Sequence, residues 1–231
     1  MKKTLYVVLL AAAAALPAYS RDVDWGMLLD AGIAGNYTDA DSDGNAHMIP
    51  FNFLAEMGGG FYVGRFFMRV FVDIGAAVAG EVKIADQKFS IRDDIEDYSF
   101  KVGAELGAKA IIHQFFNLEI PIGWSYNYAE FQKPKSLDLS KTEFSSFEKF
   151  CFLSHTLYSG LNFLFEINDY FSLMFFARTG FPISQEFMFV GLKESPGNSP
   201  PKNDAKIFEV TAGLIFRVKL FGYSGIISTI F

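Results

Sequence analysis

Alternation of apolar and polar residues is the main pattern of this chain, and it runs through most of the sequence after residue 21. From Tyr98 to Ile112 every second residue is apolar, and the residues between them include Lys101, Glu105 and Lys109. A period of two sustained over about 11 to 16 residues predicts β-strands. Such strands are much longer than the roughly five to six residues that are common in soluble sheets.

Eight strands follow from this pattern, joined by links of two alternating kinds. We expect strands at residues 25–38, 48–62, 67–82, 98–113, 118–128, 150–165, 170–182 or further, and 206–219. Short turns at 64–65, 114–117 and 168–169 alternate with polar links at 39–45, 83–97, 130–148 and around 194–201. Transmembrane barrels show this asymmetry, with short periplasmic turns and longer external loops. The sequence therefore predicts an all-β fold: one antiparallel up-and-down transmembrane β-barrel domain over residues 21–231, with four long external loops.

Side-chain size indicates which face of the strands points outward. A secreted soluble barrel would turn its apolar face inward. Here glycine and alanine alternate with the charged positions, while Trp, Tyr and Phe gather on the apolar face. An eight-stranded barrel has an interior only just wide enough for side chains, so the small residues fit its concave inner face. We therefore expect the apolar face to contact lipid.

Composition and the N-terminus agree with a membrane location. Apolar residues make up 51% of the chain and aromatic residues 17%, yet no internal run reaches the roughly 18 apolar residues of a spanning helix. A closed barrel is the other structure that satisfies the backbone in lipid. Residues 1–20 have the form of a signal peptide: Lys2 and Lys3, an apolar core, and the small residues Ala18 and Ser20 before a predicted cleavage at Arg21. A retained membrane anchor is the alternative interpretation.

Charge and cysteine content narrow the class further. The net charge is −6, and −8 once Lys2 and Lys3 are removed. Without a basic cluster, nucleic-acid binding is not expected. Cys151 is the single cysteine, so no disulfide within the chain is expected. We predict a location in the bacterial outer membrane.

The polar face supplies a set of charges for the barrel interior. These are Asp30, Glu56, Arg69, Asp73, Lys101, Glu105, Lys109, Glu119, Arg178, Glu209 and Arg217. The bases and acids nearly balance, and buried charges persist when they are paired. An open selective pore would be expected to carry an excess of one sign. The balance therefore predicts a lumen filled by ion pairs, with structural pairing as the sufficient explanation for each residue.

Aromatic residues mark the external ends of two strands. Trp124, Tyr126 and Tyr128 stand at one such end, and Tyr98 and Phe100 at the matching end of the neighbouring strand. Their position predicts part of the aromatic girdle at the membrane surface. The strands at 67–82 and 98–113 exceed the 9–11 residues that span a bilayer, so we expect the barrel to project beyond the outer surface.

The signal peptide, the eight amphipathic strands, the four long loops and the terminal Phe231 together resemble the small outer-membrane barrels of the OmpA, OmpX and OmpW kind. The resemblance covers the mature chain and is architectural, without a diagnostic motif. It implies that Phe231 is an assembly signal, because in these barrels a C-terminal aromatic residue helps the assembly machinery to recognise the last strand. Residues 220–231 depart from the pattern, since Phe221 and Tyr223 are offset from the parity of 208–218. A bulge in one long last strand, or a barrel of ten strands, would account for the offset.

Candidate catalytic groups are few. Some barrels of this size modify lipid A, and one deacylase family places a His and a nearby Ser on the lipid-facing wall. His155 and Ser159 share the apolar parity, but four residues along a strand separate them by about 13 Å, too far for proton transfer. His47 stands beside the aspartates of residues 39–43, a grouping that also suggests Ca²⁺, but the loop lacks the later Glu of an EF-hand. We predict no catalytic residue, no metal site and no cofactor.

A non-enzymatic surface barrel is the leading functional prediction: a membrane scaffold that presents loops to the outside. We expect its partners to be outer-membrane lipid, the outer-membrane assembly machinery and an external ligand held by the loops, and we expect a monomer. The alternative is a channel for small hydrophobic molecules, as the OmpW likeness implies, with apolar residues in the lumen if their parity points inward: Phe150, Phe152, Met174 and Phe176. A lipid A-modifying enzyme is the third prediction.

Overall fold

The computed structural model describes residues 25–41, 46–84, 87–91, 97–113, 115–133, 148–190 and 206–221. The predicted signal peptide and Phe231 lie outside these residues. The strands in the described part are β1 (Trp25–Asp41), β2 (Ala46–Val63), β3 (Phe66–Ile84), β4 (Gln87–Ser90), β5 (Asp97–Ile112), β6 (Phe116–Gln132), β7 (Lys149–Glu166), β8 (Phe171–Val190) and β9 (Lys206–Phe221).

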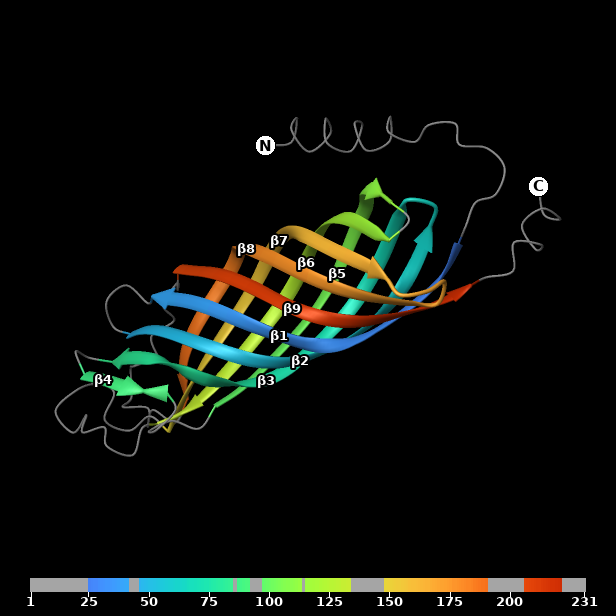
Figure 1. The fold of residues 1–231 in the computed structure, drawn as a ribbon. Coiled ribbons are helices and arrows are strands. Elements are labelled where there is room, and N and C mark those ends of the chain that lie inside the picture. Colours follow the sequence, from blue (N-terminus) through green and yellow to red (C-terminus); the bar gives the residue numbers. More distant parts are fainter. Residues whose placement is uncertain are drawn as a thin grey trace, which may run out of the picture.

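Eight of these strands close into an antiparallel barrel (Figure 1). Each pairs with the next long strand along the chain, and β9 pairs back with β1. The β1–β9 register runs without a shift from Gly26↔Phe221 to Asp41↔Lys206. The predicted eight-stranded barrel is therefore confirmed. The ten-stranded alternative is wrong for the described residues, because Leu220 and Phe221 continue the last strand beside β1.

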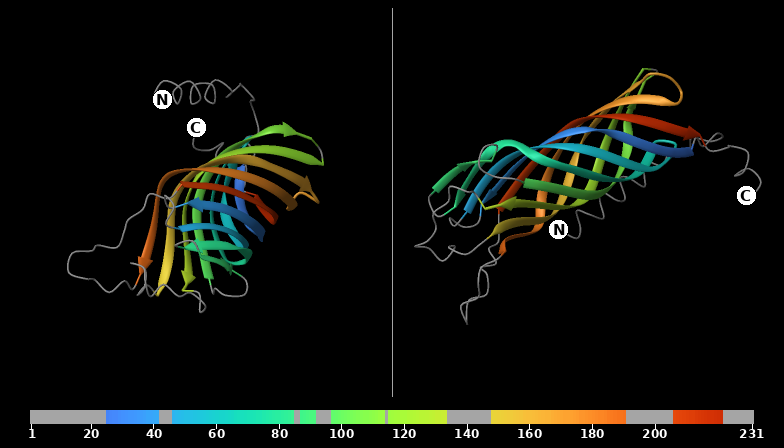
Figure 2. Two further views of the ribbon diagram at one scale, coloured as in Figure 1. Left: turned by 90° about the vertical axis from the view of Figure 1, so that its left-hand side faces the viewer. Right: turned by 90° about the horizontal axis from the view of Figure 1, so that it is seen from below.

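The two ends of the barrel differ in their connections. β1 begins and β9 ends at the same end, where β2 is followed by β3, β5 by β6 and β7 by β8 after short links (Figure 2). We call this the turn end and the opposite one the loop end. In transmembrane barrels the short turns are periplasmic, so the turn end is the periplasmic one.

Strands extend further toward the loop end than the sequence pattern predicts. The link after β1 is reduced to residues 42–45, because Ala40 pairs with Met48 and Asp41 with His47. The predicted loop at 83–97 is corrected too: Gln87–Ser90 forms β4, which pairs with Glu81–Ile84 at the end of β3. These pairs combine polar residues with buried apolar ones such as Met48, Val82 and Phe89.

Three register shifts each place one extra residue in a strand. The extra residues are Val78 in β3, Ala110 in β5 and Ile183 in β8. A β-bulge of this kind reverses the inward and outward sense of the residues that follow it. Beyond Val78, for example, the buried residue of β3 is the even-numbered Val82.

The two faces of the wall differ as the sequence predicts. The outer face carries large exposed apolar side chains on every long strand, among them Ile33, Met57, Val70, Leu106, Ile122, Leu157, Phe175 and Phe216. The inner face is buried, and about half of the buried residues are polar or charged. No helix among the described residues is long and apolar enough to cross a membrane.

Candidate functional site: the barrel lumen

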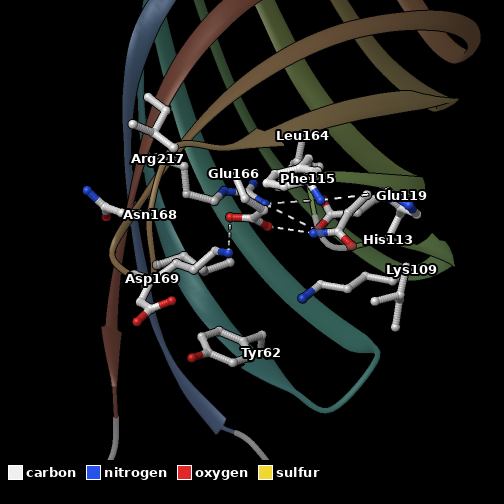
Figure 3. Close-up of a pocket in the computed structure, with 15 residues that line it drawn as sticks. Tyr62, Lys109, His113, Phe115, Glu119, Leu164, Glu166, Asn168, Asp169 and Arg217 are labelled. Atoms are coloured by element: carbon white, nitrogen blue, oxygen red, sulfur yellow. Dashed lines mark hydrogen bonds and ion pairs between the residues drawn. The ribbon is translucent and has the colours of Figure 1, made fainter.

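The lumen opens at the turn end into a cavity of about 630 Å³, which we call the vestibule. Figure 3 shows its lining, with Tyr62 and Lys109 from β2 and β5, Glu166 at the end of β7, and Asn168 and Asp169 from the turn before β8. Lys219 forms an ion pair with Glu166 here. Deeper in the lumen the cavities shrink to about 30 and 10 Å³, which is room for isolated waters only.

Arg217 of β9 forms the inner boundary of the vestibule. Its Nε donates to Asp30 Oδ1 at 2.9 Å and its Nη1 to Glu119 Oε2 at 3.1 Å. Asn162 Nδ2 also donates to Glu119, at 3.3 Å. These contacts join β1, β6, β7 and β9 across the lumen.

Arg69 and Arg178 occupy the next level. Arg69 donates from Nε to Asp30 and from Nη2 to Glu56, and its Nη1 lies 3.4 Å from Glu105 Oε1. Arg178 Nη1 lies 3.2 Å from Glu56 Oε2, and its Nη2 lies 3.3 Å from Glu105 Oε2. The three arginines and four carboxylates thus form one connected network, and such paired charges are the form in which buried ions persist.

Aromatic rings complete this level. The Arg178 guanidinium carbon lies 4.1 Å from the centroid of Phe176 and 4.9 Å from that of Phe71. Tyr158 packs edge-on against Phe71 and donates its hydroxyl to Glu105 Oε2 at 3.1 Å. The stacking adds cation–π attraction to the ion pairs.

A second polar cluster lies nearer the loop end. Lys101 forms an ion pair with Glu209 and donates to Thr211 Oγ1 at 3.1 Å. Asn36 Nδ2 donates to Glu209 Oε1 at 2.7 Å, and Asn127 Nδ2 to Glu209 Oε2 at 3.0 Å. Side chains from β1, β5, β6 and β9 therefore meet at one carboxylate.

Apolar residues close the lumen toward the loop end. Met48, Phe131, Phe150 and Phe152 are all buried, and the rings of Phe131 and Phe150 stack at 5.0 Å. Phe89 and Ile91, which β4 brings to this end, are buried as well. The sequence left open whether four apolar residues of β7 and β8 face the lumen. In the structure they are buried on the inner face, each at most 4% exposed: Phe150, Phe152, Met174 and Phe176.

All eleven charged residues singled out in the sequence stand on the inner face. Ten of them are buried, and Lys109 is half-buried at the vestibule with its ammonium 5.6 Å from the centroid of the Tyr62 ring. Asp73 is brought beside the network but has no hydrogen-bond partner for either carboxylate oxygen. The sequence analysis did not single out the other neutral members: Asn36, Phe71, Asn127, Tyr158, Asn162 and Thr211. They share the parity of the charged residues, which was the signal available for them.

The outer face carries the aromatic residues predicted for the girdle. Tyr98 and Trp124 are exposed, while Phe100, Tyr126 and Tyr128 are half-buried against their neighbours. Tyr128 Oη donates to Glu130 Oε2 at 2.6 Å. All five alternate with the buried residues of β5 and β6.

His155 and Ser159 also stand on the outer wall, where they are engaged separately. The His155 ring stacks on Trp124 with a centroid distance of 5.6 Å, while Ser159 Oγ donates to the carbonyl oxygen of Pro121 at 3.1 Å. At the loop end, His47 Nε2 and Asp39 Oδ1 are 2.9 Å apart. Within the part of the chain that the structure describes, no three His, Cys, Asp or Glu side chains gather as a metal site.

A closed barrel with an apolar outer wall and a charged interior defines a class: the integral outer-membrane β-barrels. No protein-family model and no curated protein matches the chain. Among solved structures, OprG from Pseudomonas aeruginosa aligns with a TM-score of 0.57 at 11% identity, over 88% of this chain and 99% of that one. Neisserial surface protein A aligns with a TM-score of 0.53 at 11% identity, over 84% and 97%. AlkL, solved in lipid bilayers, aligns at 0.50 and 11%, over 90% and 96%.

The likeness to these proteins is one of fold. It agrees with the predicted small outer-membrane barrel and, together with the lipid-facing wall, with the predicted place in the outer membrane. At 11% identity it does not extend to what each protein binds or transports.

Proposed function

We propose that the protein is a non-enzymatic surface barrel, a membrane scaffold whose external links bind a ligand and whose lumen is closed by its own side chains. The observation that carries this proposal is the network that joins Arg178, Glu56, Arg69, Asp30 and Arg217 across the lumen. Every guanidinium in it has at least two carboxylate partners, so ions would have to break several pairs to pass.

Conductance across planar bilayers tests the closed lumen. We expect the purified, refolded protein to give no sustained conductance, whereas an open porin reconstituted in the same way conducts steadily. A second sample with Arg69→Ala removes the central cation of the network and should give cation-selective openings, because three carboxylates lose a partner. Stable, large conductance of the wild type would contradict the proposal.

The partners follow from the same surfaces. We propose that the apolar wall binds outer-membrane lipid, that the assembly machinery inserts the chain, and that the protein is a monomer without nucleic-acid partners. Light scattering in detergent with the detergent mass subtracted measures the oligomeric state, and a dimer mass would refute the monomer.

Passage of small hydrophobic molecules is a second candidate, favoured by the apolar closure at the loop end. Pairing between β3 and β5 stops at Gly75↔Ser99, so beyond that point fewer backbone bonds join these two strands. Phe152 lines the same small cavity as Ser99. If this region admits a solute, Phe150→Ala and Phe152→Ala should increase uptake of an apolar dye into vesicles. Phe163→Ala, on the outer face, is the matched control and should leave uptake unchanged. Wild-type uptake no faster than that of empty vesicles would remove this candidate.

A further inference from the structure

Asp73 of β3 differs from every other buried acid of the described lumen. Its side chain is fully buried, and neither carboxylate oxygen has a hydrogen-bond partner. An ionised carboxylate in such a place costs several kcal/mol unless something compensates its charge. The structure must therefore supply a cation or a proton.

The buried cations of the lumen are already engaged with other acids. Lys101 is bonded to Glu209, and the three arginines share Asp30, Glu56, Glu105 and Glu119. The buried acids of the described lumen exceed its buried bases, six to four: Asp30, Glu56, Asp73, Glu105, Glu119 and Glu209 against Arg69, Lys101, Arg178 and Arg217. Two negative charges are therefore left without a buried counterion, and Asp73 is the buried acid whose carboxylate oxygens accept no hydrogen bond.

The strand register places a second carboxyl group opposite Asp73. Glu56 of β2 is its direct cross-strand partner on one side. On the other side the partner is Lys101 of β5, whose ammonium is bonded to Glu209 and not to Asp73. Directly opposed residues have Cβ atoms about 4.5–5.5 Å apart. Two carboxylates at this distance resist ionising together. A protonated carboxyl group gains an O–H donor that its neighbour can accept.

We propose that Asp73 and Glu56 hold one proton between them, so that the closed lumen contains a proton-binding acid pair. The charged and titratable groups around the pair are Asp30 of β1, Arg69 of β3, Lys101 and Glu105 of β5, Tyr158 of β7, Arg178 of β8 and Glu209 of β9. Glu56 keeps its bonds to Arg69 and Arg178, and Asp73 donates the shared proton toward it. Loss of the proton leaves two facing carboxylates and weakens the packing of the lumen.

Infrared spectroscopy of the protein in lipid vesicles tests the proton directly. At neutral pH we expect a carbonyl stretching band of a protonated carboxylic acid, which disappears on titration to alkaline pH. The band should be absent in Asp73→Asn and should persist in Asp30→Asn, because Asp30 is bonded to two arginines. A wild-type spectrum without the band, or an unchanged band in Asp73→Asn, would overturn the proposal.

Stability measurements give an independent test. The unfolded chain loses the Asp73 proton near pH 4, whereas the folded barrel keeps it, so the folded state binds one proton more and its stability falls as pH rises. Relative to Asp73→Asn, the wild-type folding constant should decrease by up to about tenfold per pH unit above pH 4. A parallel pH dependence of the two proteins refutes the shared proton, as does a dependence on Na⁺ against K⁺, which would indicate a bound metal cation. Conductance is a separate readout, because a lumen can be closed with or without the proton.

Discussion

The guanidinium of Arg69 is fully buried and faces three carboxylates. Removing one partner of a buried ion pair typically costs about 3–5 kcal/mol, because the remaining charge is left uncompensated. Arg69→Ala should therefore lower the free energy of unfolding by about that amount, measured by urea titration in vesicles. Arg65→Ala, at the exposed turn between β2 and β3, is the control and should change it by less than about 0.5 kcal/mol.

Glycines of the inner face make room for rings. A Cβ added to Gly103 would lie 2.5 and 2.7 Å from atoms of the Phe71 ring. Overpacking of this kind costs about 1–3 kcal/mol, and Gly103→Val should reduce stability accordingly. Ala104→Val places a valine at the next position of β5, on its exposed outer face, and should be nearly neutral in the same urea titration. Equal losses for the two variants would contradict the inward orientation of Gly103.

At the scale of the element, β5 tests the orientation of the wall. Leu106 lies near the middle of the strand and is 62% exposed on the outer face. Arginine on the lipid face near the midplane costs about 2–4 kcal/mol, and near the membrane surface about 0–1 kcal/mol. We expect Leu106→Arg to impair folding into vesicles strongly, while Gln132→Arg, at the exposed loop end of β6, leaves it almost unchanged. A Leu106→Arg protein that folds as well as the wild type would place this face away from lipid.

The strands themselves could be predicted because period two persists wherever one face meets lipid. The bulges at Val78, Ala110 and Ile183 could not, since an extra residue changes register without changing composition. β4 was missed because Gln87–Ser90 lies outside the apolar belt and carries no alternation.

The predicted charges could be assigned to the inner face by parity alone, but their partners could not. Asp30 meets Arg217 across the β1–β9 pairing and Arg69 across β2. Which side chains reach one another depends on the shear of the closed barrel, a property of the whole sheet that no local pattern records. For the same reason only the structure shows that the carboxylate of Asp73 has no hydrogen-bond partner.

For the whole molecule, the prediction concerns mobility in detergent gels. A closed barrel has no unpaired edge between its strands, so it should resist dodecyl sulfate until it is heated. We expect two bands of different mobility for unheated and boiled samples, and the folded band should be protected from protease. A single mobility under both conditions would argue against a closed barrel.

The pairing of β9 with β1 has a consequence for biogenesis. It joins the two extremes of the described chain, and the Asp30–Arg217 contact spans 187 residues. Contacts so distant along the chain form late and slowly, and until they form, β1 and the newest strand present open edges. The ring can therefore shut only after β9 has been synthesised, so the last described strand, and not any earlier one, completes the wall.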